Sequence, residues 1–210
     1  MSRSAPLDLM STTVAPGTRA HWQRRRERSM RSIQRIALEL FEARGYDHTT
    51  ISDVAAAAQL SPRTVFRYFP TKEDLVFWST YSPRLPSLMA EQPRTLPPAT
   101  ALRQALMTGL AATFGEDEER ILRWARIGFR TATLRPRMAM QQATLTELFV
   151  DLLSKRASVH DSELRSRVIA AALSSALFVA LDIWQTADGR LNLPELLDEA
   201  LAEAASAFDA

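Results

Sequence analysis

Apolar residues recur along most of the chain at the three- and four-residue spacing of amphipathic helices. The first stripe, between about residues 24 and 44, consists of Ile33, Ala37, Leu40 and Phe41. Similar spacing predicts helices at 51–58, 62–68, 72–88, 100–114, 116–132, 136–158, 162–186 and 194–208. No stretch of any length alternates apolar and polar residues as a strand does. The pattern therefore predicts an all-α protein of about nine helices.

Helix boundaries are marked by capping residues in the first third of the chain. Thr50, Ser61 and Thr71 are N-cap residues, and the first and third are followed three residues later by Asp, which makes capping boxes. Pro62 stands at the first position of its helix, where its missing N–H costs nothing. Gly45 can adopt the left-handed conformation that ends the first helix.

Residues 51–69 form two short predicted helices joined by a tight turn. Such a pair buries enough surface only through a shared apolar face, for which the candidates are Val54, Ala55, Ala58, Leu60 and Val65. This arrangement predicts a helix-turn-helix, although a helical hairpin with capped ends fits the bare pattern as well.

The second helix of this pair carries residue types that suit a DNA major groove. Arginine binds guanine or phosphate through its planar fork, and hydroxyl groups bind backbone or base edges. Residues at the two neighbouring helix starts are placed to hold phosphates on either side. The candidate DNA-binding residues are Thr50, Ser61, Pro62, Arg63, Thr64, Arg67, Tyr68 and Lys72.

Charge is distributed unevenly although the net charge is only +2. Residues 1–80 carry 12 Lys and Arg against 8 Asp and Glu, and residues 81–210 carry 14 against 16. We expect residues 1–23 to form a disordered arm, because residues 1–18 are rich in Ser, Thr, Pro and Gly. The arginines between residues 24 and 31 are either a solvated helix start or an arm that contacts DNA phosphates or a minor groove.

Nearly fifty residues, from 31 to 78, resemble the DNA-binding domain of TetR-family (tetracycline-repressor-like) regulators. The matching landmarks are Leu40-Phe41, Gly45-Tyr46, Thr49-Thr50, Val54-Ala55, Ser61, Thr64, Arg67-Tyr68-Phe69 and Lys72-Glu73-Asp74-Leu75. The resemblance implies a DNA-binding domain at residues 24–72, with its motif at 50–69, and a helical ligand-binding and dimerisation domain at 73–210. It implies that Thr50, Tyr68 and Lys72 contact phosphates and that Arg63 and Thr64 lie on the recognition helix.

Two residues depart from the family pattern. Gln59 stands where the turn usually has Gly, and a non-glycine residue with a positive φ costs about 1 kcal/mol. Phe66 stands where the family often has a phosphate-binding Tyr. Since Phe66 lacks the hydroxyl group, we expect it to pack against the protein instead.

The helix at 162–186 is apolar on nearly all sides between residues 168 and 181, which is typical of a buried helix. With 194–208 it resembles half of a four-helix bundle at a dimer interface. Candidate interface residues are Ala172, Ser175, Val179, Leu196 and Leu197. The alternative is that this helix is buried in the core of a single protomer. We expect no membrane span, because of the length of the helix and because it contains Asp182.

Large apolar residues of the C-terminal part are candidates for an effector pocket, with plain core as the alternative. They are Trp78, Met107, Phe114, Trp124, Phe129, Phe149 and Phe178. This part also resembles a TetR subgroup with a mycofactocin-regulator-type C-terminal domain, some of whose members sense long-chain acyl-CoA. Arg120, Arg123, Arg126 and Arg130 share one face of the helix at 116–132, where they either meet a phosphate-bearing headgroup or are solvated.

Signatures of other protein classes are missing from the sequence. It has no Cys, its three His are scattered, and its six Gly are isolated from one another. We therefore expect no catalytic residues, no metal, no cofactor and no enzyme activity, and the apolar core of a signal peptide is missing, so we expect a cytoplasmic protein. The different-class alternative is a small all-α enzyme acting on a lipid thioester.

The sequence as a whole predicts a ligand-responsive homodimeric repressor. Its partners would be a near-palindromic double-stranded DNA operator and a small hydrophobic effector. A TetR-type activator and a ligand-independent regulator remain the alternatives.

Overall fold

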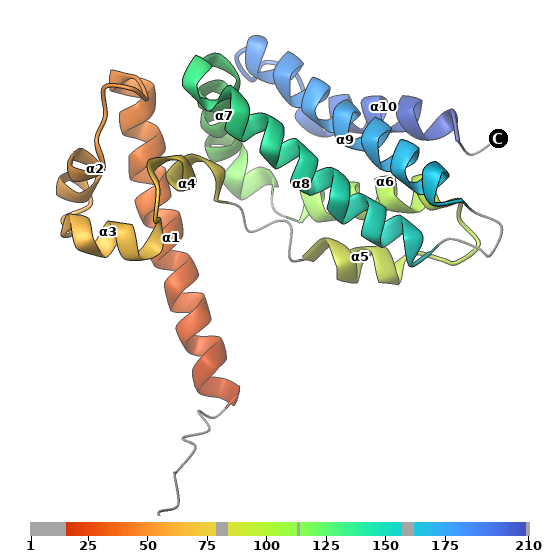
Figure 1. The fold of residues 1–210 in the computed structure, drawn as a ribbon, viewed down its shortest axis with the longest axis horizontal. Helices are drawn as coiled ribbons and strands as arrows, with labels where there is room; N and C mark the ends of the chain where they lie inside the picture. Colours follow the sequence, from red (N-terminus) through yellow and green to blue (C-terminus); the bar gives the residue numbers. More distant parts are fainter. Residues whose placement is uncertain (1–15, 79–83, 113, 157–161, 209–210) are drawn as a thin grey trace, which may run out of the picture.

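The computed structural model describes residues 16–78, 84–112, 114–156 and 162–208, and this part of the chain is all-helical (Figure 1). The prediction of an all-α fold is confirmed. Its helices are α1 (Pro16–Arg44), α2 (Ile51–Ala57), α3 (Pro62–Tyr68), α4 (Lys72–Phe77), α5 (Leu85–Glu91), α6 (Pro98–Ala111), α7 (Phe114–Arg130), α8 (Arg135–Ser154), α9 (Glu163–Thr186) and α10 (Leu193–Ser206), with a 3-10 turn η2 (Ala132–Leu134) before α8.

Helices α1 to α4 form an N-terminal head around one apolar core. The predicted stripe of α1 lies in this core, where Ile33, Ala37 and Phe41 are buried against Val54 of α2 and Val65 of α3. The tight turn between α2 and α3, together with this packing, makes the predicted helix-turn-helix. Leu60 is a correction: it is 38% exposed, because it lies in the turn, outside the buried faces of both helices.

The first helix begins at Pro16, well before the predicted start near residue 24. The prediction of a disordered arm at residues 1–23 is therefore wrong for residues 16–23, and residues 1–15 lie outside the described part. Arg, Gln and Glu have high helix propensity, and they dominate the stretch that precedes the packed part of α1.

The predicted helix at 72–88 is also wrong, because α4 ends at Phe77 and α5 begins at Leu85. Pro83 predicts a kink near residues 82 and 83, and these residues lie outside the described part of the chain. Gln34 of α1 donates hydrogen bonds from Nε2 to the main-chain oxygens of Val76 (3.2 Å) and Trp78 (2.8 Å). These contacts hold the end of α4 against α1. Pro86 in the first turn of α5 prevents a continuous helix, since it has no N–H to donate to the preceding turn.

The remaining helices form the C-terminal domain, in which α8 and α9 lie side by side and α6 and α10 pack behind them (Figure 1). One core gathers Leu102 of α6, Phe149 of α8 and Leu201 of α10. A second surrounds Trp184 of α9, whose Nε1 donates to the main-chain oxygen of Leu191 at 3.0 Å.

The long apolar helix α9 is buried on one side only. By length and composition it could cross a membrane, but half of its most apolar window is buried inside this fold, as in a core helix of a soluble protein. Within a single protomer the expected burial is therefore met on one side only, and the outer face keeps apolar side chains in solvent. These are Leu164 (72% exposed), Val168 (46%), Val179 (55%) and Ile183 (46%).

Candidate nucleic-acid interface

Helix α3 presents a row of exposed side chains because its N-cap and its buried residues fix its orientation on the head. The Ser61 hydroxyl oxygen accepts a hydrogen bond from the Thr64 N–H at 3.2 Å, and the two hydroxyl groups lie 2.9 Å apart. Val65 and Phe69 point into the head core. The predicted DNA-contacting residues Ser61, Pro62, Arg63 and Arg67 are exposed, and Thr64 and Tyr68 are partly exposed.

Phe66 is a second correction, because it does not pack. It is 49% exposed, since its neighbour Val65 occupies the core position and a step of one residue turns a helix by about 100°. Phe66 therefore lies on the outer side of α3 with Arg63 and Arg67. An exposed aromatic ring in this position is suited to apolar contact with a thymine methyl group.

The turn between α2 and α3 has the left-handed residue that its sequence predicts. Gln59 has a φ of +55°. The Leu60 N–H donates to the Ala55 oxygen and the Gln59 N–H donates to the Ala56 oxygen, which is a Schellman motif. Gln59 thus occupies the position where glycine is most common, and it keeps the turn at a cost of about 1 kcal/mol.

Thr50 caps α2, as predicted. Its hydroxyl oxygen accepts from the Asp53 N–H at 3.1 Å, and its hydroxyl and main-chain N–H both donate to the Asp53 carboxylate. These hydrogen bonds hold the pKa of Asp53 below its usual range. In this structure the Thr50 hydroxyl group serves the cap.

Lys72, at the start of α4, folds over two aromatic rings. Its Nζ lies 4.0 Å from the ring centroid of Tyr46 and 5.8 Å from that of Phe41. Burial lowers the pKa of Lys72, against the opposing effect of Asp47 and Glu73. Cation–π contact holds the ammonium group at the edge of the head.

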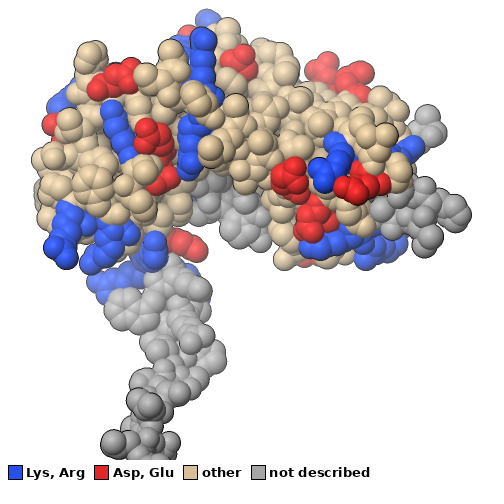
Figure 2. All heavy atoms as spheres, viewed as in Figure 1, with Lys and Arg blue, Asp and Glu red and all other residues tan. Residues whose placement is uncertain are grey.

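Tyr68 brings together two arginines that are far apart in the sequence. The Cζ of Arg67 lies 5.4 Å from the Tyr68 ring centroid, and the Cζ of Arg26 of α1 lies 5.9 Å from it. Figure 2 shows Lys and Arg atoms gathered along the edge where α3 crosses α1. No sequence pattern indicates the contact between Arg26 and Tyr68, because it depends on how α1 and α3 cross.

The arginines of α7 connect the head to the C-terminal domain. Arg123 and Arg126 both donate to the Glu42 carboxylate of α1, at 2.9 and 3.0 Å. Arg120 Nη1 donates to the Gln34 Oε1 at 3.2 Å, and Arg130 pairs with the Asp188 carboxylate at 3.2 Å. The expected solvated face is wrong for Arg120, Arg123 and Arg126, whose side chains are partly buried in these contacts, whereas Arg130 is exposed. Headgroup binding stays a prediction.

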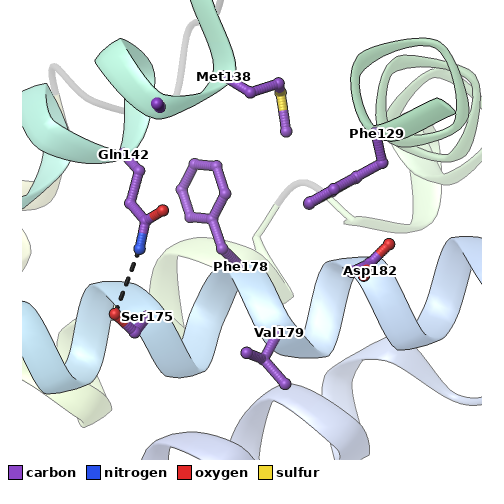
Figure 3. Close-up of a pocket in the computed structure, with 8 residues that line it drawn as sticks. Phe129, Met138, Gln142, Ser175, Phe178, Val179 and Asp182 are labelled. Atoms are coloured by element: carbon purple, nitrogen blue, oxygen red, sulfur yellow. Dashed lines mark hydrogen bonds between the residues drawn. The ribbon is translucent and has the colours of Figure 1, made fainter. Parts of the chain in front are cut away.

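A groove of about 400 Å³ opens between α7, α8 and α9 (Figure 3). Phe129, Met138 and Phe178 supply its apolar surface, and the rings of Phe129 and Phe178 meet edge to face at 6.3 Å. Gln142 donates to the Ser175 hydroxyl group at 3.2 Å along one side. The complete lining is Phe129, Met138, Ala139, Gln142, Ser175, Phe178, Val179 and Asp182, and it contains no Lys or Arg.

Two of the seven predicted pocket residues, Phe129 and Phe178, line this groove. Phe149 is fully buried in a separate core. Trp78 packs against the head core. Met107, Phe114 and Trp124 pack against the core around Trp184. Gln142 and Asp182 are polar groove residues outside the predicted apolar set, and only the crossing of three helices reveals them.

The predicted dimer-interface residues divide between surface and core. Ser175 and Val179 are exposed on α9, and Ala172 and Leu196 are partly exposed. Leu197 is a correction, because it is 5% exposed and packs inside one protomer with Trp184 and Leu193.

An all-helical chain with a capped helix-turn-helix head and a second helical domain defines a class of DNA-binding regulators. Two family models match: "Bacterial regulatory proteins, tetR family" over residues 33–77 and "MftR C-terminal domain" over residues 96–209, more than half of the chain. The chain belongs to the TetR family of transcriptional regulators. The curated relatives reported below are described as transcriptional regulators.

Two curated relatives cover different parts of the chain. The HTH-type transcriptional regulator TcmR of Streptomyces glaucescens is 43% identical over 72 residues, which are 34% of this chain and only 32% of TcmR. MftR of Mycobacterium tuberculosis, described as a mycofactocin biosynthesis transcriptional regulator, is 26% identical over 189 residues, 89% of this chain and 94% of MftR.

Solved structures share the fold at lower identity. NalD of Pseudomonas aeruginosa, a repressor of the MexAB-OprM multidrug efflux pump, aligns with a TM-score of 0.56 and 20% identity over 87% of this chain and 96% of that one. FadR of Thermus thermophilus, a TetR-family repressor in complex with lauroyl-CoA, aligns with a TM-score of 0.51 and 24% identity over 83% and 92%.

Proposed function

We propose that this TetR-family regulator acts in the cytoplasm as a homodimeric repressor. Two copies of α3 would enter successive major grooves of a near-palindromic operator, about 34–36 Å apart. The observation that carries the proposal is the exposed row of Arg63, Phe66 and Arg67 on a helix anchored by Val65. Arginine reads guanine or phosphate, and the phenyl ring reads thymine methyl groups.

Backbone contacts would come from the helix starts and from the end of α3. Tyr68 and Lys72 lie on either side of the chain segment that joins α3 to α4. Thr50 would reach a phosphate only by exchanging one of its hydrogen bonds to Asp53. Ser61, Pro62 and Thr64 at the first turn of α3 complete the predicted DNA-binding surface.

Dimerisation would use the outer face of α9. Leu164, Val168, Val179 and Ile183 repeat at spacings that place them on one side of the helix, and all are exposed. Apolar side chains at helical spacing in solvent favour burial against a second copy. Ala172 and Ser175 between them are small enough for close approach, and Leu196 of α10 would lie at the margin. We expect Val168→Asp to yield a monomer in sedimentation experiments.

An effector would bind in the groove between α7, α8 and α9, at the margin of the proposed dimer face, because Ser175 and Val179 belong to both. Its aromatic and Met surface favours an apolar compound, and Asp182 at its rim favours a neutral or cationic one. Among the residues that the structure describes, no Lys or Arg lines the groove, and Arg130 is engaged by Gln185 and Asp188, so the described lining does not favour the phosphates of an acyl-CoA. Residues 73–210 would then form the effector-binding and dimerisation domain, and residues 24–72 the DNA-binding domain.

The experiment that tests this function is selection of binding sites from a random DNA pool at physiological salt. We expect a near-palindromic consensus from the wild-type protein and its loss of base preference in Arg63→Ala. Parallel selections with dodecanoyl-CoA and with a long-chain alkylamine test the effector. Release by the amine alone supports the charge argument, and release by the thioester alone contradicts it. If no consensus emerges, the proposed function fails.

A further inference from the structure

Residues 24–28 of α1 precede the part of the helix that packs into the head. The helix is 29 residues long, but its buried positions begin at Met30. Residues 24–28 are all exposed. In Figure 1 this part of α1 extends away from the head, beyond α3. Residues 24–28 bury no apolar side chain in their own protein, and ordering them costs conformational freedom, so an external partner would account for their order.

The composition of this segment identifies the charge of the partner. Arg24, Arg25, Arg26 and Arg28 occur within five residues, with Glu27 as the one acidic residue among them. Five consecutive charged side chains leave this stretch without an apolar side. An amphipathic helix needs such a side to insert into a lipid surface. The stretch therefore suits a polyanion that is bound at its surface.

The position of the segment identifies the polyanion as DNA. Arg26 and Arg67 both stack on the Tyr68 ring, with their Cζ atoms 5.9 and 5.4 Å from its centroid. Arg67 and Tyr68 are in the last turn of α3, so the basic stretch of α1 begins beside the end of the recognition helix. Any duplex seated on α3 continues past this point.

We propose that residues 24–28 of α1 form a second DNA-contacting element, which binds the phosphate backbone just outside each half-site. Arg26 connects this element to α3 through Tyr68. Arg24 and Arg28, one helical turn apart, extend the contact along α1. Phosphate contacts add affinity and salt dependence without sequence preference. This inference rests on the proposed operator binding, and it lengthens the footprint beyond the bases that α3 reads.

The test uses the full-length protein and the consensus selected above, in two duplexes. One ends at the outer edges of the half-sites, and the other continues for about ten base pairs, one helical turn, on each side. The variant is Arg24→Gln with Arg28→Gln, which keeps good helix formers. The matched control is Arg35→Gln with Arg190→Gln, which removes the same charge from exposed arginines elsewhere. Circular dichroism checks that the helix content is unchanged.

On the long duplex we expect the variant to bind about tenfold or more weakly than the wild type, with the same consensus. Each lost phosphate contact lowers the slope of log affinity against log salt concentration by about 0.9. A dimer that loses two phosphate contacts on each protomer should therefore show a slope that is lower by about 3.6. On the short duplex the two proteins should bind alike, and the control should match the wild type on both. Hydroxyl-radical footprints should lose their outermost protection in the variant alone.

Several outcomes overturn the inference while leaving the proposed function intact. An unchanged salt slope on the long duplex would show that the segment does not contact phosphates. A changed consensus in the variant would show that it reads bases instead. Binding to phosphatidylglycerol vesicles by the wild type but not the variant, with DNA binding unaffected in both, would assign it to a membrane surface. Failure of the wild type to bind any consensus would instead remove the proposed function itself.

Discussion

Gln34→Leu tests whether one buried amide holds the head to the rest of the protein. Gln34 is fully buried, with 0% exposure. Its Nε2 donates to the oxygens of Val76 and Trp78, and its Oε1 accepts from Arg120 of α7. One side chain therefore joins three helices, α1, α4 and α7. Leucine has a similar bulk, so the substitution removes the hydrogen bonds and leaves little cavity.

The expected cost follows from the groups left without a partner. A buried polar group that loses its partner costs about 1–3 kcal/mol. The bond to the Val76 oxygen is buried, and those to the Trp78 oxygen and from Arg120 are partly buried. Water can replace part of the hydrogen bonding lost by the Trp78 oxygen and by Arg120, and Arg120 keeps its ion pair with Asp117. We therefore expect a loss of about 2–4 kcal/mol in the free energy of unfolding.

Urea and thermal unfolding measure this loss. For a chain of this size the midpoint temperature should fall by about 4–16 °C. Hydrogen exchange should accelerate in α4 more than in α2, since only α4 is held by Gln34. The matched control is Gln104→Leu on the exposed side of α6, which should change stability by less than about 0.5 kcal/mol. A Gln34→Leu protein as stable as this control would refute the reasoning.

Four further predictions concern the head. Lys72→Ala should weaken binding to all DNA sequences alike and lower the salt slope by about one unit per contact, whereas a change in preferred bases would contradict the phosphate role. Phe66→Ala should reduce operator affinity by about fivefold to tenfold, measured by fluorescence anisotropy, with thermal stability unchanged because its ring is exposed. Gln59→Gly should raise the free energy of unfolding by about 0.5–1 kcal/mol in urea titrations, because the positive φ costs glycine nothing; an unchanged value would mean that the turn is not strained. The pKa of Asp53 is lowered by its hydrogen bonds from Thr50, so its contribution is present above the ordinary aspartate pKa of about 3.9 and is lost as pH falls through the folded value. Asp53→Asn should therefore lose less stability than the wild type on acid titration below about pH 4.

Local features of the head could be predicted from the sequence because they depend on neighbouring residues. The caps at Thr50, Ser61 and Thr71 each bind an N–H three residues later. The bounds of α3 agree with the prediction, since Ser61 begins it and Pro70 follows it closely. The left-handed turn at Gln59 was implied by the family resemblance, in which Gly usually stands at this position.

Errors arose where a distant residue decides the outcome. The pattern of residues 72–88 is compatible with one helix, and nothing in it shows that Gln34, more than forty residues earlier, binds the end of α4. Phe66 was expected to pack because it is apolar, but Val65 and Phe69 already fill the available core positions. Which of several apolar neighbours is buried depends on the orientation of the helix, not on its composition.

The sequence by itself determined most of the helices, the caps of the head and the helix-turn-helix, because hydrogen bonds over three or four residues and helical periodicity are local. Only the tertiary structure decided which charged and apolar groups meet. The α7 arginines find Glu42 and Gln34 of α1, Arg26 finds Tyr68, and the groove forms where three helices cross. Each of these contacts joins residues tens of positions apart, so it depends on the packing angle of whole helices, which no local pattern specifies.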